Sequence, residues 1–155
     1  MEIKIRPLQI EDAKISYKWR NDPEVFKYTG AHYDHEIAYA DEANWIKKIK
    51  TNKDEYRCAI LVDDEYIGNI YLTDIENGSA TYHIFIGNKS YWGKGIATEA
   101  SRQIIEYGFN ELNLNQINLK VKHDNIAAKA LYVKLGFKEY DMDDVWLSMR
   151  LLRKC

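Results

Sequence analysis

Two glycines separated by one residue, Gly93 and Gly95, stand between an apolar strand-like run at residues 83–86 and an amphipathic helix that begins at Ile96. Glycine at a strand-to-helix turn lets the backbone N–H groups turn inward and approach a ligand closely. The positive end of the helix dipole points at the same place, which favours a phosphate group. A glycine pair also fits a tight turn that binds nothing, so the prediction of a pyrophosphate site depends on a second feature.

The second feature is a helical pattern in residues 125–137, which read NIAAKALYVKLGF. On a helical projection of about 100° per residue, Asn125, Lys129 and Tyr132 fall on one stripe, which presents an amide, an ammonium and a phenol in a row. Tyr132 as a rim residue of an ordinary amphipathic helix is the alternative. We expect the opposite, small apolar side to press on a sheet, with the residues Ala127, Ala130 and Leu131.

These two segments resemble the acetyl-CoA-binding core of the GNAT-type N-acetyltransferases, in particular the branch with ribosomal-protein N-terminal, polyamine and amino-sugar acetyltransferases. This chain matches the family pattern Gln/Arg-x-x-Gly-x-Gly/Ala at Gly93 and Gly95 and differs from it at Ser90, where the family has Gln or Arg. The difference matters little, because such a loop binds mainly through its backbone amides. Stretches at residues 6–8 and 19–25 look like the same branch, so the resemblance covers essentially the whole chain. The later pattern Asn-x-x-Ala-x-x-x-Tyr-x-x-x-Gly-Phe is matched at Asn125, Tyr132, Gly136 and Phe137.

The resemblance implies a fold, a cofactor and a set of cofactor contacts. The fold is α+β, a single domain over residues 1–155 with a mixed, mostly antiparallel sheet flanked by helices and a splayed strand pair at the cofactor. The cofactor is acetyl-CoA, whose arm in this family lies like an added strand beside residues 84–86. The expected cofactor-binding residues are Ile84, Phe85, Ile86, Trp92, Gly93, Lys94, Gly95, Ile96, Ala97, Thr98, Asn125 and Lys129.

Composition and local patterns limit the other classes of protein. With 22 Lys and Arg against 24 Asp and Glu, the net charge of −2 provides no basic field for nucleic acid. No apolar run approaches the ~20 residues of a membrane span, and the start alternates like a strand rather than a signal peptide. We therefore expect a cytoplasmic monomer or homodimer. No metal site is expected, because paired ligand spacing is missing at the histidines His32, His35, His83 and His123.

The order of elements follows from periodicity and turn residues. Turns are expected at residues 63–65 and 76–79. Asp124 fits an N-cap and Gly136 a C-terminal stop, with the Tyr132 helix between them. The expected strands are 3–6, 56–62, 66–72, 81–86, 116–121, 137–140 and 145–151, and the other expected helices are 11–19, 23–28, 35–49 and 96–109.

Acetyl transfer from a thioester to an amine requires two proton movements. Tyr132 is protonated at neutral pH and can donate to the leaving CoA thiolate, the role that the resemblance implies. A backbone N–H within residues 84–86 is the natural donor to the thioester oxygen. The base that receives the amine proton stays open between His83, Glu99 and a relay through water.

For the acceptor, aromatic and guanidinium side chains near the N-terminus could form a pocket, although Trp19 and Trp45 also fit helix packing. The acids at 141, 143 and 144 could attract an amine or form a solvated turn. We expect acetyl transfer to a primary amine of a small molecule, an amino sugar or polyamine. The alternatives are a protein N-terminus as acceptor, a silent acyl-CoA-binding module and another nucleotide-binding α/β domain. The candidate substrate residues are Trp19, Arg20, Asn21, Tyr28, Tyr33 and His83.

Overall fold

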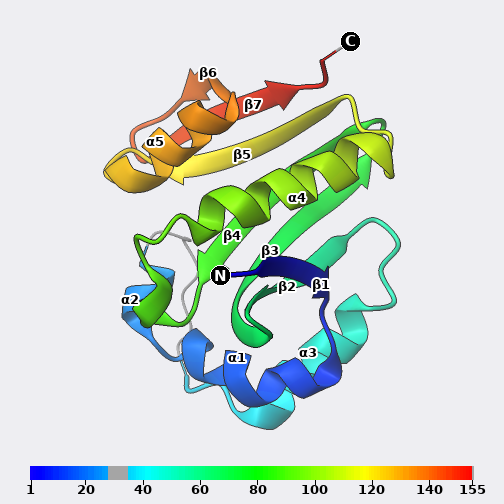
Figure 1. The fold of residues 1–155 in the computed structure, drawn as a ribbon, viewed down its shortest axis with the longest axis vertical. Helices are drawn as coiled ribbons and strands as arrows, with labels where there is room; N and C mark the ends of the chain where they lie inside the picture. The colour runs from blue at the N-terminus through cyan, green and yellow to red at the C-terminus, as the bar shows by residue number, and fades with distance from the viewer. Residues whose placement is uncertain (28–34, 155) are drawn as a thin grey trace.

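The computed structural model describes residues 1–27 and 35–154, which form one seven-stranded sheet with helices on both faces (Figure 1). The strand order is β1-β2-β3-β4-β5-β7-β6, and each neighbouring pair is antiparallel except β4–β5. The predicted fold class, α+β with a mixed, mostly antiparallel sheet, is confirmed. The strands are β1 (Ile3–Pro7), β2 (Tyr56–Val62), β3 (Glu65–Glu76), β4 (Ser79–Ile86), β5 (Gln116–Lys122), β6 (Lys138–Met142) and β7 (Trp146–Leu152).

The helices are α1 (Ala13–Arg20), α2 (Pro23–Phe26), α3 (Tyr39–Ile49), α4 (Ile96–Asn110) and α5 (Ile126–Leu135), with short 3-10 turns at Ile10–Asp12 and Lys89–Tyr91. The predicted helix over 35–49 begins later, at Tyr39, because the Asp41 carboxylate accepts a hydrogen bond from the N–H of Ala38 and fixes the first turn there. At α2, Asp22 caps the helix by accepting from the N–H of Glu24, with Pro23 in the first position.

Two tight hairpins set the register of the central strands. In the β2–β3 turn, Asp63 and Asp64 have φ of 48° and 71°, and in the β3–β4 turn, Asn77 and Gly78 have φ of 52° and 77°. Positive φ at both central residues is the geometry that matches the twist of paired strands. Both predicted turns are therefore confirmed, and the second brings Tyr71 directly opposite His83.

A bulge interrupts the ladder of β3 with β4 between Thr73 and Glu76. Asp74 lies in this bulge with φ of 50°, a left-handed conformation that is uncommon for a residue other than glycine. The bulge lets β3 continue to Glu76, beyond the predicted end at residue 72. Bulges re-aim side chains, and this one lies two residues from Tyr71 on the sheet.

Side chains alternate along the strands and produce one hydrophobic core on each face of the sheet. Helix α4 crosses one face in front of β4, and α5 follows it, whereas α1 and α3 lie at the other side beneath β2 and β3 (Figure 1). The α4 core includes Cys58, Ile60, Ile70, Leu72, Tyr82, Ile96, Ala100, Ile104 and Tyr132. The α1–α3 core includes Leu8, Ala13, Trp19, Phe26, Ile46, Ala59, Tyr66 and Tyr71.

Strands β4 and β5 pair only over their first residues, where Ser79–Thr81 lie beside Gln116–Asn118. Among the described strands, no rung joins this pair beyond Thr81, although β4 continues beside β3 as far as Ile86. The two strands therefore diverge, and the expected splayed pair is confirmed. The open side of β4 runs from Tyr82 to Ile86.

The outer edge of β1 is covered by one side chain of α4. The amide of Gln103 donates to the carbonyl oxygen of Ile3 at 2.8 Å and accepts from the N–H of Ile5 at 3.2 Å. A side-chain amide thus supplies the donor and the acceptor that a neighbouring strand would otherwise supply.

Candidate active site

The glycine loop has the open backbone that the sequence predicts. Gly93 and Gly95 have φ of 73° and 78°, and Gly95 is the N-cap of α4. A Cβ built on either glycine meets no atom within 4 Å, so the space in front of the loop is empty. Glycine is needed here for its left-handed conformation rather than for packing against a neighbour.

Six consecutive backbone N–H groups, those of residues 93–98, have no hydrogen-bond partner in the described part of the chain. The N–H of Trp92 just before them donates to Lys89, and the N–H of Glu99 just after them donates to Gly95. The first turn of a helix leaves such donors free, and the helix dipole adds positive potential. This row of amides, which we call the amide row, fits the oxygens of a phosphate or pyrophosphate group.

The loop is fixed to the open end of β4 by Trp92. Its indole Nε1–H donates to the carbonyl oxygen of Ile86 at 2.8 Å, although 42% of the residue remains exposed. Lys94 lies next to it, with its ammonium 5.7 Å from the centre of the Tyr91 ring. The amide row and the splayed strands therefore belong to one continuous surface.

Helix α5 follows the predicted segment, but its cap and its buried face differ from the prediction. Asn125, not Asp124, is the N-cap, and its side-chain oxygen accepts from the N–H of Ala128 at 3.2 Å. Gly136 ends the helix with φ of 102°, as predicted. Asn125 therefore uses its oxygen for the cap and has its NH2 group left for a ligand.

The predicted orientation of this helix is wrong for the alanines and for Tyr132. Ala127 and Ala130 are exposed, whereas Tyr132 is buried with 8% of its surface exposed. Leu131, the third residue expected on the packing side, is half-buried and packs against the core as predicted. The physical reason is that α5 is apolar almost all the way round, so that size decides which side packs and the large ring wins over the alanines. Asn125 and Lys129 are half-buried at the border of that face.

Tyr132 lies on the α4 side of β4, against Tyr82, the first residue of β4 that has no partner on β5. Its ring packs edge-on against Tyr82 at 5.7 Å and against Phe137 at 5.9 Å. Burial raises the pKa of Tyr132 to about 12, and no described residue forms a hydrogen bond with its hydroxyl. A phenol that is protonated and unpaired is free to donate to a ligand atom.

Two polar residues behind Tyr132 have no signal in the sequence. Ser101 of α4 and Tyr82 share a buried hydrogen bond of 2.6 Å between their hydroxyl oxygens. Burial raises the pKa of Tyr82 well above its ordinary value, so this hydroxyl also stays protonated. The bond fixes the ring against which Tyr132 packs. Nineteen positions separate the two residues, and only the packing of α4 on β4 brings them together.

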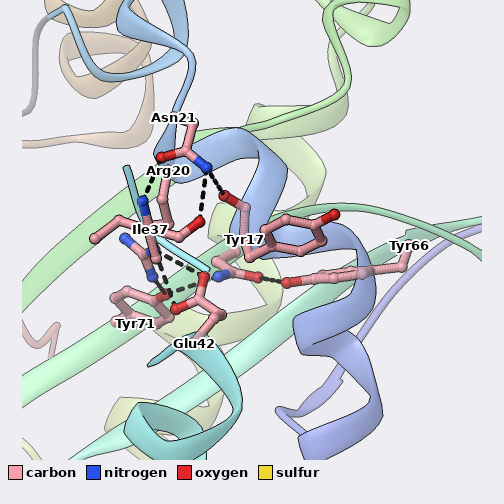
Figure 2. Close-up of polar contacts among 8 residues, drawn as sticks. Tyr17, Arg20, Asn21, Ile37, Glu42, Tyr66 and Tyr71 are labelled. Carbon is pink, nitrogen blue, oxygen red and sulfur yellow. Dashed lines mark hydrogen bonds and ion pairs between the residues drawn. The ribbon is translucent and has the colours of Figure 1, made fainter. Parts of the chain in front are cut away.

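Of the predicted acceptor residues, Trp19 and Arg20 lie in the α1–α3 core. The Trp19 ring lies 4.8 Å from that of Tyr66 and 6.0 Å from that of Phe85. Arg20 forms an ion pair with Glu42 at 3.0 Å, and Figure 2 shows the two side chains meeting between α1 and α3. Only 3% of the Glu42 side chain is exposed.

Asn21 fastens the end of α1 to the segment before α3. Its side-chain oxygen accepts from the N–H of Ile37 at 2.7 Å, and its amide donates to the carbonyls of Ile37 and Tyr17 (Figure 2). Tyr28 and Tyr33 lie outside the described residues. The structure therefore assigns internal contacts to three of the predicted acceptor residues, and their role toward a substrate stays a prediction.

A chain of buried polar groups runs along β3 beneath α1 (Figure 2). The Tyr66 hydroxyl donates to the side-chain oxygen of Asn69, whose amide donates to the Tyr71 hydroxyl at 2.7 Å. Tyr71 in turn accepts from Arg20 at 3.4 Å. Burial raises the pKa of Tyr71, although Arg20 and Arg57 oppose the shift. This chain ties the ion pair to the sheet.

His83 is exposed on the α1–α3 side of β4. Its Nε2 lies 3.0 Å from the hydroxyl oxygen of Thr73, and its ring lies 6.5 Å from that of Tyr71. Although the residue is exposed, the sheet surrounds enough of its ring for desolvation to lower the pKa of His83. The positive charge of Arg57 lowers that pKa further. His83 is therefore neutral at physiological pH.

The described residues contain no cluster of three or more His, Cys, Asp or Glu side chains that could hold a metal ion. Across residues 1–27 and 35–154, every helix is too short or too polar to cross a lipid bilayer.

Comparison with known proteins agrees with this geometry. The chain matches the model of the acetyltransferase (GNAT) domain over residues 2–138. It is 34% identical over 142 residues to the uncharacterized N-acetyltransferase p20 of Bacillus licheniformis, covering 88% of this chain and 79% of that protein. It is 32% identical over 138 residues to the spermidine N(1)-acetyltransferase of Escherichia coli K12, covering 87% and 72% of the two chains.

The fold also superposes, with a TM-score of 0.87, on the crystal structure of spermidine N-acetyltransferase from Vibrio cholerae in complex with CoA and spermine. That match covers 97% of this chain and 95% of the other at 23% identity. The chain belongs to the GNAT acetyltransferase family. Members of this family use acetyl-CoA, and the protein is an acetyl-CoA-dependent N-acetyltransferase.

Proposed function

We propose that this enzyme acetylates a primary amine of a small molecule, either a polyamine or an amino sugar. The observation that carries acetyl transfer from acetyl-CoA is the amide row at the head of α4, beside the splayed end of β4. The Escherichia coli relative, named for spermidine, and the Vibrio cholerae structure, which contains spermine, support a polyamine as the acceptor.

In this proposal the cofactor lies along the surface formed by the amide row and the open end of β4, which Trp92 links. The pyrophosphate accepts hydrogen bonds from the amide row, and Lys94 adds a cation beside it. The pantetheine arm lies beside Ile84–Ile86, where β4 has no neighbour on its β5 side. Asn125 and Lys129, both half-buried on α5, are the further cofactor contacts of this proposal.

Tyr132 is the proton donor to the leaving CoA thiolate. Its buried phenol stays protonated because burial raises its pKa to about 12. A positioned acid of this kind contributes roughly 10²–10⁴-fold to a rate. A backbone N–H on the open side of β4 would donate to the thioester oxygen as negative charge develops there.

The acids near the C-terminus contribute little to this proposal, because two of them have local partners. The Asp143 carboxylate accepts from the N–H groups of Val145 and Trp146 at 2.8 Å and 2.7 Å, and these bonds lower its pKa. Asp141 accepts from the N–H of Met142. Both serve the turn between β6 and β7.

A panel of amines tests the acceptor. Purified enzyme with acetyl-CoA would be given spermidine, spermine, amino sugars and a peptide with a free N-terminus, and release of CoA would be followed. Turnover of the polyamines or amino sugars supports the proposal. Turnover of the peptide alone would assign a protein N-terminal acetyltransferase, and tight CoA binding without any turnover would assign a silent acyl-CoA-binding module.

We also expect the enzyme to be cytoplasmic and to form a monomer or homodimer. Sedimentation of the purified protein measures its assembly. A large ring-like assembly would contradict this expectation.

A further inference from the structure

We propose that His83 is the general base that receives the proton of the attacking amine. This assignment rests on the proposed function, because it presupposes an amine acceptor. It adds a second proton-transferring group at the splayed strands and places it across β4 from Tyr132.

The position of His83 on β4 carries the proposal. Thr81 is the last residue of β4 that pairs with β5, so His83 belongs to the open stretch of the strand. Tyr82 and Tyr132 lie on the α4 side of this stretch, and His83 lies with Phe85 and Tyr71 on the α1–α3 side. A thioester in the opening would thus have an acid on one side of the strand and a base on the other.

The imidazole has one nitrogen held and one nitrogen free. Nε2 lies 3.0 Å from the Thr73 hydroxyl, and we assign the proton to Nε2 so that it donates to that oxygen. Nδ1 then carries the lone pair, and no described residue forms a hydrogen bond with it. His83 is exposed, and in this proposal the substrate amine approaches Nδ1.

Charged and titratable groups of β3 and of β2 act on the ring. Arg57 of β2 favours the neutral form, whereas Glu55 just before β2 and Asp74 of β3 favour the charged form. Tyr71, directly opposite, stays protonated and neutral. The bulge that gives Asp74 its left-handed backbone lies beside Thr73, the residue that holds the ring. Strained backbone of this kind clusters at functional sites.

The competing carboxylate of Glu99 is already engaged. It accepts from the Gln103 amide at 3.3 Å and lies 3.9 Å from the guanidinium of Arg102. All three residues belong to α4, so this group serves the helix and the β1 edge. Of the two protein candidates for the base, only His83 has a free acceptor atom on the open strand.

The proton movements balance with the two groups in these roles. The amine nitrogen attacks the thioester carbonyl carbon, a C–N bond forms, and the nitrogen proton moves to Nδ1 of His83. The C–S bond breaks, and the sulfur takes the proton of the Tyr132 hydroxyl, which yields the amide and CoA thiol. The imidazolium then loses a proton to solvent and the tyrosinate regains one.

The test compares His83→Gln with His123→Gln, a matched control outside the site whose ring contacts the Asp143 carbonyl. Rates with the best amine of the panel and CoA affinity would be measured between pH 5 and 9. We expect His83→Gln to lose roughly 10²–10⁴-fold in kcat at unchanged CoA affinity, and the control to keep its rate. The wild-type acid limb, with a midpoint below ~6.5, should vanish in His83→Gln.

Added imidazole should restore part of the rate of His83→Ala, which a purely structural role would not allow. A His83→Gln enzyme that keeps the wild-type rate and acid limb would overturn the assignment of the base alone. Wild-type enzyme that turns over no amine would overturn the proposed function itself.

Discussion

The indole N–H of Trp92 donates to the carbonyl oxygen of Ile86, the last residue of β4, at 2.8 Å. This bond crosses from the loop to the strand along which the thioester arm would lie. The bond closes a loop of the chain between Ile86 and Trp92, which contains the 3-10 turn at Lys89–Tyr91. The glycine loop and the open end of β4 are therefore held at a fixed separation by one side chain.

Gly95→Asp should weaken CoA binding by well over tenfold. The new carboxylate would lie where the amide row points, and its charge repels phosphate. Gly95→Ala is the control, because it adds left-handed strain of roughly 1–2 kcal/mol without charge and meets no neighbouring atom. Isothermal calorimetry on both folded variants separates the two effects. Unchanged CoA affinity in Gly95→Asp would remove this loop from the cofactor site.

Tyr132→Phe should lower kcat by roughly 10²–10⁴-fold at unchanged CoA affinity. The variant keeps the ring that packs on Tyr82 and Phe137 and loses only the hydroxyl. Because the pKa of Tyr132 is about 12, the protonated form persists through pH 10, and wild-type kcat should show no alkaline limb from this group below that pH. A wild-type rate in the variant, with chemistry rate-limiting, would leave Tyr132 as a packing residue.

Arg20→Met should destabilise the fold by about 3–5 kcal/mol, because it leaves the Glu42 carboxylate buried without its guanidinium. The double variant Arg20→Met, Glu42→Leu should recover most of that loss, since hydrophobic groups of similar volume can replace a buried pair. Urea unfolding of Arg20→Met, of Glu42→Leu and of the double variant gives the coupling energy. Equal stability of Arg20→Met and the double variant would show that the pair does not act as a unit.

Gly87→Ala should lower stability by about 1–3 kcal/mol or prevent folding. A Cβ at this position would come within 2.0 Å of the Trp19 ring, which cannot retreat between Tyr66 and Phe85. Ser90→Ala nearby is the control, because the Ser90 side chain is exposed and the bond between its N–H and Asn88 is kept. Thermal unfolding compares the two, and a Tm of Gly87→Ala equal to that of the control would contradict the clash.

Features fixed by local backbone rules could be predicted from the sequence. The glycine loop, the turns at 63–65 and 76–79 and the stop at Gly136 each depend on a conformation that few residues adopt. Such rules act over a few residues, so they can be read without knowledge of the fold. The splayed strand pair came from the family resemblance instead.

The orientation of α5 and the partners of Arg20 could not be predicted in the same way. A helix that is apolar nearly all round has no periodicity from which to choose its buried face, and here Tyr132 displaced the alanines. Arg20 is set by Glu42 and Tyr71, which lie 22 and 51 positions away. Those contacts exist only after the sheet and both of its helical layers have formed.

The hydrogen bonds between Gln103 and β1 also affect how the chain folds while it is being synthesised. The strand is made first, yet the side chain that covers its outer edge follows 98 to 100 residues later. On the ribosome, the outer edge of β1 therefore stays uncovered until α4 has emerged. A chain stopped before residue 103 would expose this edge to other nascent chains, so the edge stays open to mispairing until α4 has folded onto it.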